Sequence, residues 1–198
     1  MSEIVKLSEL DDNQLAQAID VFIDGFYDTL KSISKDKGKI HRLFKYAFID
    51  DMAYVYLHEG NAVGFLGIGN YQKSPVKLNK EIFLEELGKF FGRNAYNAVS
   101  ASMEKIKIND PDEVFIDFIA THPEYRSMGI GKKLIEFICE NLEYKYISLD
   151  VLTKNLRAKA FYERMGFKTI STKLDILVML QGHGRRILMR MDVENRGK

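Results

Sequence analysis

Apolar and polar residues alternate along the chain with two periods, and the first stretch has the period of a helix. After Asp11, apolar side chains recur three or four positions apart, which predicts an amphipathic helix; they are Leu15, Ala18, Ile19, Phe22 and Ile23. Asp11, with Gln14 three positions later, has the pattern of a capping box at its start. A short strand is predicted before it, at residues 4–7, and a second helix near residues 40–48.

The period then changes to that of strands. Residues 53–57 and 62–68 are rich in β-branched and aromatic side chains and flank the sequence HEGN, which predicts a hairpin. Residues 71–113 return to helical character, and we expect two helices there, joined near Gly92. Two apolar stripes would form their packed faces: Phe83, Leu87, Phe90 and Phe91, then Tyr96, Val99, Met103 and Ile106.

The last third of the chain alternates strands and helices. Residues 114–120 read as a nearly continuous apolar strand with one charge, Asp117. The glycine-containing sequence RSMGIG (126–131) follows, and then an amphipathic helix with Leu134 and Ile138 on its apolar side. We expect a strand at 146–152, a helix at 155–165 ended by Gly166, and two strands, near 167–174 and 185–193. The pattern indicates a mixed α/β chain.

Composition limits the size and the class of the protein. The chain has 198 residues, of which 46% are hydrophobic. This is enough to bury one hydrophobic core but rather little for two, so we expect a single domain over residues 1–198. Its net charge of +1 argues against a chain built mainly to hold nucleic acid. With one cysteine, no apolar leader and no apolar run long enough for a membrane span, we expect a cytoplasmic protein without membrane contact.

The sequence RSMGIG raises a chemical question, because it lies where a strand gives way to a helix. The first backbone N–H groups of a helix lack intrahelical acceptors and lie at the positive end of its dipole, so such a turn can hold a phosphate. The P-loop pattern fails, since Lys132 is followed by Lys133 rather than Ser or Thr. The dinucleotide-binding pattern also fails, since Leu134 replaces its third glycine. From these residues alone, a phosphate site and a merely tight turn both stay open.

Two sequence blocks together resemble a known family. The turn has the form Arg-x-x-Gly-x-Gly after a strand that ends in IATHPEYR, and NLRAKAFYERMGF (155–167) supplies Asn-x-x-Ala, aromatic-Tyr-Glu and Gly-Phe. Both blocks resemble the signatures of the GNAT superfamily of acyl-CoA-dependent N-acyltransferases. The resemblance covers residues 114–167 and implies one domain with a mixed, largely antiparallel sheet flanked by helices. The segment 71–113 would then be a helical insert before the cofactor-binding strand.

The resemblance also implies a co-substrate, acetyl-CoA, and the residues that hold it. Amides of the glycine turn would bind the pyrophosphate, Asn155 would contact the pantetheine arm, and Tyr162 would lie beside the thioester sulfur. A backbone N–H near residues 119–121 would meet the oxyanion. The implied cofactor-binding residues are Ile119, Ala120, Thr121, Arg126, Ser127, Met128, Gly129, Ile130, Gly131, Lys132, Asn155, Ala158 and Tyr162.

Two residues are candidates for proton transfer. Asn155 and Tyr162 are seven positions apart, close to two helical turns, so they share a face with the small Ala158 between them. A phenol can protonate a leaving thiolate at neutral pH, and Tyr162 is our candidate acid. Asp117, on the same strand face as Ile119, is our candidate base. A structural carboxylate is the competing interpretation of Asp117.

The acceptor is not identified by the sequence. We expect an N-acetyltransferase that acts by direct attack of a primary amine of a small molecule or peptide. A non-catalytic acyl-CoA-binding or regulatory module is an alternative, and so is an acyltransferase acting on a protein or an aminoacyl-tRNA. His183, between two glycines, could face the acceptor site, although an exposed loop histidine is the favoured interpretation. No residue set has metal-ligand spacing, so we expect no metal, and the 71–113 insert is suited to a lid or a homodimer contact.

Overall fold

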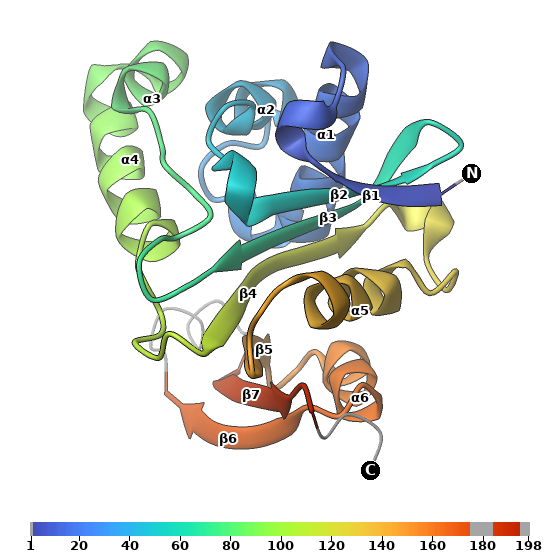
Figure 1. Cartoon of the computed structure of the whole chain (residues 1–198). Coiled ribbons are helices and arrows are strands. Elements are labelled where there is room, and N and C mark those ends of the chain that lie inside the picture. Colours follow the sequence, from blue (N-terminus) through green and yellow to red (C-terminus); the bar gives the residue numbers. More distant parts are fainter. Residues whose placement is uncertain (1, 175–183, 195–198) are drawn as a thin grey trace.

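The computed structural model describes residues 2–174 and 184–194. Strands and helices alternate irregularly along the chain (Figure 1). The strands are β1 (Ser2–Lys6), β2 (Ala53–His58), β3 (Asn61–Gly69), β4 (Glu113–Thr121), β5 (Tyr146–Leu152), β6 (Lys168–Lys173) and β7 (Arg186–Asp192). The α-helices are α1 (Asp12–Leu30), α2 (Lys37–Phe44), α3 (Lys80–Leu87), α4 (Lys89–Met103), α5 (Ile130–Asn141) and α6 (Leu156–Arg164).

These strands form one sheet of mixed direction. Among the described residues its order is β1-β2-β3-β4-β5-β7-β6, and every neighbouring pair is antiparallel except β4 with β5. The paired positions of β4 and β5 end at Ile116 with Leu149, although both strands continue beyond that point. The two strands therefore separate, and the sheet opens between residues 117–121 and residues 150–152.

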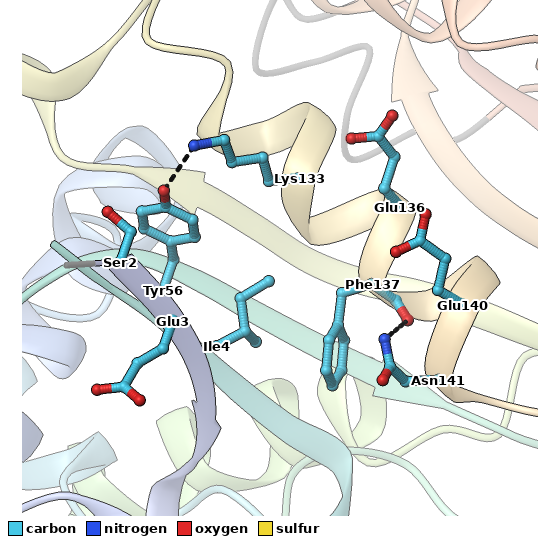
Figure 2. A pocket seen from close by; sticks show the side chains of 9 residues that line it. All are labelled: Ser2, Glu3, Ile4, Tyr56, Lys133, Glu136, Phe137, Glu140 and Asn141. Carbon is cyan, nitrogen blue, oxygen red and sulfur yellow. Dashed lines mark hydrogen bonds between the residues drawn. The ribbon is translucent and has the colours of Figure 1, made fainter.

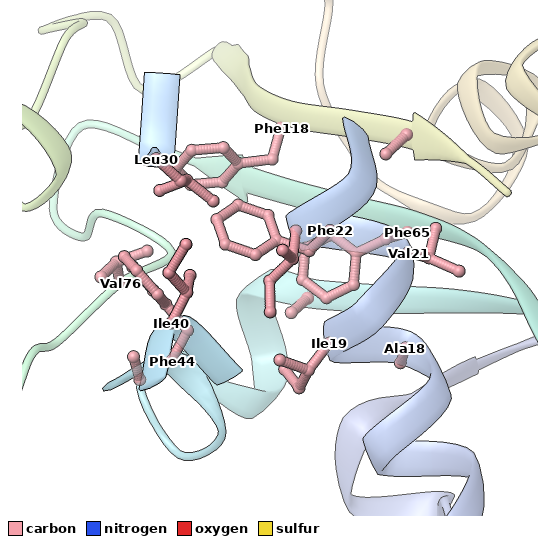
Figure 3. Packing of buried hydrophobic residues seen from close by; sticks show 14 of the residues in the cluster. Ala18, Ile19, Val21, Phe22, Leu30, Ile40, Phe44, Phe65, Val76 and Phe118 are labelled. Carbon is pink, nitrogen blue, oxygen red and sulfur yellow. The ribbon is translucent and has the colours of Figure 1, made fainter. Parts of the chain in front are cut away.

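Helices cover both faces of the sheet. α1 to α4 lie on one face and α5 and α6 on the other (Figure 1). On the first face the ring of Phe22 packs edge-on against Phe118 of β4 at 5.3 Å and tilted against Phe65 of β3 at 5.6 Å (Figure 3). Such pairs add to the large apolar area that each ring buries, and they fix α1 across β3 and β4. The predicted mixed, largely antiparallel sheet flanked by helices is confirmed.

The helix and hairpin predictions for the N-terminal half are also confirmed. The Asp11 carboxylate accepts from the Gln14 amide at 2.8 Å, while the Gln14 side chain accepts from the Asp11 amide at 3.2 Å. This reciprocal pair satisfies two backbone donors at the start of α1. The Asp11 cap thus marks where α1 begins.

The segment 71–113 differs from the prediction. Its helices occupy residues 80–103 only, and they break at Gly88, with φ of 81°, rather than near Gly92. Gly92 lies inside α4, where it starts a packed face that continues with Tyr96 and Val99. Phe90 and Phe91 consequently lie off that face, 85% and 50% exposed. The prediction that these two phenylalanines belong to a packed stripe is wrong. The prediction of helical structure over the whole of residues 71–113 is wrong as well.

Gly92→Ala is expected to destabilise the protein. A Cβ at this position would lie 2.2 Å from the backbone oxygen of Phe83, and a backbone atom has little room to give way. Overpacking of this kind costs about 1–3 kcal/mol, more than the roughly 1 kcal/mol that alanine gains over glycine in a helix. Urea denaturation measures the free energy of unfolding, with exposed Arg93→Ala as the control in the same helix. Stabilisation by Gly92→Ala would mean that α3 and α4 are not in this close contact.

Candidate functional site

A large concavity lies where the sheet opens. It has a volume of about 630 Å³, and its wall is built by the C-terminal part of α1, the end of α4, β4, β5 and the start of α6. Residues 115–119 of β4 and residues 149–152 of β5 line it. Because the two strands no longer pair beyond Ile116, the cavity reaches between them. A narrow group can therefore enter the sheet at this place.

The glycine turn follows directly from β4. A short 3₁₀ turn (Pro123–Tyr125) is followed by Arg126, by Ser127 with φ of 71°, and by Gly129 with φ of 76°. α5 begins at Ile130, with Gly129 as its N-cap. The left-handed conformation at Gly129 favours glycine, and nothing lies within 4 Å of the point where a Cβ would stand. The space beside the N-cap of α5 is therefore open.

Most side chains of this turn are on the surface. Arg126, Ser127, Met128 and Lys132 are exposed, and Ile130 is buried under the helix. Lys132 forms an i,i+4 ion pair with Glu136, in which the nitrogen and oxygen are 3.5 Å apart. An anion bound here would meet backbone N–H groups and the helix dipole, with exposed cations close by in the sequence.

α6 links the turn to the cavity. A Cβ at Gly131 would lie 3.5 Å from Cζ of Phe161, so the start of α5 packs against α6. The Phe161 ring in turn contacts Tyr162, whose side chain lines the cavity together with Asn155 and Ala158. The two sequence blocks thus lie at adjoining parts of one region, and a long ligand bound at the turn can reach the cavity along α6.

Asn155 and Tyr162 have well-defined environments. Asn155 caps α6, since its side-chain oxygen accepts from the Ala158 amide at 3.1 Å. Tyr162 is buried among Phe161 and Phe167, and this burial raises the pKa of its phenol to about 12. A phenol with such a pKa keeps its proton at every physiological pH. It can donate that proton, but it cannot act as a base in its resting state.

Asp117 is the buried carboxylate of the cavity. Its side chain is 3% exposed, and its Oδ1 forms an ion pair with Nζ of Lys107 at 2.7 Å. Burial raises the pKa of the Asp117 carboxyl to about 6, an effect that the Lys107 charge opposes and the nearby Asp150 reinforces. At neutral pH the carboxylate is mostly ionised, and a pKa near 6 suits a group that takes up a proton.

Lys107 was missed by the sequence analysis. It lies between α4 and β4 in a segment without regular structure, and it places its ammonium group 4.7 Å from the centre of the Phe115 ring. Asp28 and Thr29 of α1, and Met103 at the end of α4, also line the cavity and were not predicted. Nothing in the local sequence pattern indicates these four residues, because their place depends on how α1 and α4 pack on the sheet.

The remaining candidates lie at different distances from the cavity. Ile119 lines it, while Ala120 is buried and Thr121 pairs with Gly64 of β3. His183 lies outside the described residues. Within the part of the chain that the structure describes, no group of three or more His, Cys, Asp or Glu residues is placed to hold a metal ion. Over the same residues, no helix is long and apolar enough to cross a membrane.

A second concavity, of about 330 Å³, lies between β1 and α5 (Figure 2). Lys133 donates to the hydroxyl of Tyr56 at 2.8 Å there, and Glu3, Glu136 and Glu140 stand around it. It includes neither the glycine turn nor any of the candidate proton-transfer residues. Most of the predicted site residues lie instead at the opening of the sheet or in the turn beside it.

Comparison with known proteins gives a family-level match. The sequence profile described as the acetyltransferase (GNAT) family matches residues 22–167. A curated relative, the 5-NmdU N-acetyltransferase of Pseudomonas phage PaMx11, is 37% identical over 68 residues, which are 34% of this chain and 48% of that protein. The chain thus spans about half the length of this curated relative.

Two solved structures have a similar fold. The ribosomal-protein-S18-alanine N-acetyltransferase from Escherichia coli aligns over 100% of this chain and 97% of its own, with a TM-score of 0.56 and 16% identity. A GNAT family acetyltransferase from Elizabethkingia anophelis with acetyl-CoA bound aligns over 96% of this chain and 97% of its own, with a TM-score of 0.56 and 11% identity. At these identities the likeness concerns the fold.

Proposed function

The chain belongs to the acetyltransferase (GNAT) family, and on this premise we propose that it transfers an acetyl group from acetyl-CoA to a primary amine of a small molecule or peptide. The observation that carries the proposal is the cavity at the opening between β4 and β5, which is lined by both the buried Asp117 and the buried Tyr162. One group is suited to take up a proton and the other to give one, as aminolysis of a thioester requires.

Acetyl-CoA fits the region from the turn to the cavity. Its pyrophosphate would bind to the amides at Ser127 to Lys132, where the space beside Gly129 admits an anion. Its pantetheine arm would run past Asn155 and Ala158 into the opening of the sheet, with a backbone N–H at 119–121 for the thioester oxygen. The small Ala158 and the unpaired strand ends support this path.

The chain's own residues supply the proton transfers. An acceptor amine arrives mostly protonated at neutral pH, because its ordinary pKa is near 10.4. Asp117 takes up one proton from the ammonium before the attack, and Tyr162 gives its proton to the departing thiolate. The second proton that the nitrogen loses, as the tetrahedral intermediate collapses, restores the Tyr162 phenol. The reaction is direct attack of the amine on the acetyl carbon, without an acyl-enzyme.

The rate is expected to depend on pH through Asp117. Because the base must be ionised and the pKa of Asp117 is raised to about 6, kcat/KM should rise with pH up to about 6 and level off above it. The measurement is a pH–rate profile, made with an amine that stays protonated throughout the range. In Asp117→Asn the step near pH 6 should disappear; its persistence would assign the titration to another group.

Release of free thiol from acetyl-CoA tests the activity itself. We expect release with at least one amine class in a panel of polyamines, aminoglycosides, amino acids, aminated nucleosides and peptides with free N-termini. The product should carry the acetyl group on nitrogen, as mass spectrometry would show. Tight binding of acetyl-CoA without thiol release for any class would favour the alternative, an acyl-CoA-binding or regulatory module.

We also propose that the whole chain forms one domain and works in the cytoplasm. A sheet that joins strands from both ends of the chain supports one domain. The exposed Phe90 and Phe91 of α4 are suited to a contact between two copies of the chain.

A further inference from the structure

A lysine of the protein already stands beside the proposed base. Nζ of Lys107 is 2.7 Å from Oδ1 of Asp117, and both residues line the cavity that also contains Tyr162 and Asn155. The Lys107 side chain is 27% exposed and that of Asp117 is 3% exposed. The Lys107 side chain is thus partly exposed to solvent, while the Asp117 carboxylate that it contacts is buried.

An acceptor amine must take up the same position. To lose its proton to Asp117 it has to come within hydrogen-bond reach of that carboxylate, about 2.6–3.2 Å between heavy atoms. The Phe115 ring, 4.7 Å from Nζ, offers its face to a cation there. The Lys107 side chain is a primary amine on an unbranched alkyl stem, so it has the chemistry of the acceptors proposed above.

We propose that Lys107 is a self-acetylation site, at which the protein modifies its own ε-amine with acetyl-CoA. The inference rests on the proposed function, because it uses the same donor, base and acid. The Lys107 nitrogen forms a bond to the acetyl carbon, and the carbon–sulfur bond of the thioester breaks. The Lys107 ammonium loses two protons in all. One goes to Asp117 before the attack, the thiolate receives a proton from Tyr162 and leaves as free coenzyme A, and the second proton from the nitrogen, lost as the tetrahedral intermediate collapses, restores the Tyr162 phenol.

The local structure permits this step. Lys107 lies in the segment 104–112, which has neither helix nor strand and connects α4 to β4. A side chain on such a segment can shift toward a bound thioester without breaking a helix or a strand ladder. Acetylation would turn the ammonium into a neutral amide and remove the cation that pairs with Asp117. Because the acetylated side chain would still fill the acceptor position, the modified chain should turn over external amines more slowly.

The first test is incubation of the wild-type protein with acetyl-CoA and no other amine. Peptide mapping by mass spectrometry should find one acetyl group on Lys107. Two other lysines report background chemistry in the same sample: Lys105, exposed on the same segment, and Lys154, on the wall of the same cavity. Asp117→Asn should lose the labelling of Lys107 down to the level of Lys105. Equal labelling of all three lysines in the wild type would overturn the proposal.

The second test removes the Lys107 amine by mutation and supplies a free alkylamine in solution in its place. In Lys107→Ala the emptied place should accept a short alkylamine such as butylamine, whose amine and stem replace the missing side chain. We expect N-acetylbutylamine to form faster with Lys107→Ala than with the wild type, whereas Lys105→Ala should match the wild type. The same rate in all three proteins would mean that Nζ of Lys107 does not occupy the acceptor position.

The outcomes separate this inference from the proposed function. If the wild type acetylates an amine from the panel but leaves Lys107 at background, self-acetylation is rejected and the transferase stands. If acetyl-CoA binds but neither Lys107 nor any amine is acetylated, both are rejected. Labelling of Lys107 that is lost in Asp117→Asn supports both.

Discussion

Gly129→Glu is expected to abolish the binding of acetyl-CoA. The glutamate would place a negative charge where the pyrophosphate meets the first amides of α5, in space that is open in the native protein. Repulsion between unit charges about 4 Å apart is on the order of 4 kcal/mol near a protein surface, and each 1.4 kcal/mol changes affinity about tenfold. Isothermal titration should therefore show a loss of more than roughly 100-fold in affinity.

Two control variants separate charge from backbone strain. Gly129→Gln has the same strain and nearly the same bulk without the charge, so it should bind acetyl-CoA more tightly than Gly129→Glu. Gly60→Glu carries the same charge at the β2–β3 hairpin, where φ is 80° and a Cβ also has open space, and it should bind like the wild type. Wild-type affinity in Gly129→Glu would show that the pyrophosphate binds elsewhere.

Tyr162→Phe is expected to slow turnover by about 100-fold or more while leaving the affinity for acetyl-CoA unchanged. The phenol is the proposed donor to the departing thiolate, and positioned proton transfer is typically worth about 100- to 10,000-fold. Removal of the hydroxyl leaves the ring packed between Phe161 and Phe167, so the fold should be preserved. Steady-state kinetics of thiol release and direct titration of acetyl-CoA give the two quantities.

Tyr54→Phe is the matched control for this experiment. Tyr54 is buried, and burial, with Asp51 nearby, raises the pKa of its phenol, but it lies on β2 and not on the wall of the cavity. We expect its turnover to equal that of the wild type. Near-wild-type turnover of Tyr162→Phe, under conditions where the chemical step limits the rate, would reject Tyr162 as the acid.

The parts of the fold that the sequence predicted are those that depend on short-range patterns. The capping box at Asp11, the β2–β3 hairpin and the order of β4, glycine turn and α5 each occupy a few consecutive residues with one dominant period. Asn155 and Tyr162 line the same cavity because one caps α6 and the other lies within it, at a separation that the local sequence already fixes. Such features need no knowledge of tertiary contacts.

In the segment 71–113, hydrophobic periodicity did not predict the helix boundaries correctly. Periodicity places apolar residues on a stripe but does not tell which of two glycines, four positions apart, ends a helix. Gly88 takes the positive φ, and Gly92 serves the contact of α4 with the Phe83 backbone. Phe90 and Phe91 lie on the exposed side as a result, although their spacing from Phe83 fits a packed stripe.

The environment of Asp117 also could not be predicted from the sequence. A lone charge in an apolar strand indicated a special carboxylate, but a structural role and a base were equally compatible with it. The ion pair with Lys107 arises because α4 and the segment after it return along the end of β4, a tertiary relation without a local signal. The same relation places a primary amine of the chain at the proposed acceptor position.

Backbone hydrogen exchange with and without coenzyme A tests the central claim most directly, because it locates the bound donor along the chain. The account predicts slower exchange at Ser127–Lys132 and at residues 119–121 when the ligand is bound. It predicts no change in β1 or at the other residues of the groove between β1 and α5 (Figure 2). Slower exchange in that groove, with none at residues 127–132, would contradict it.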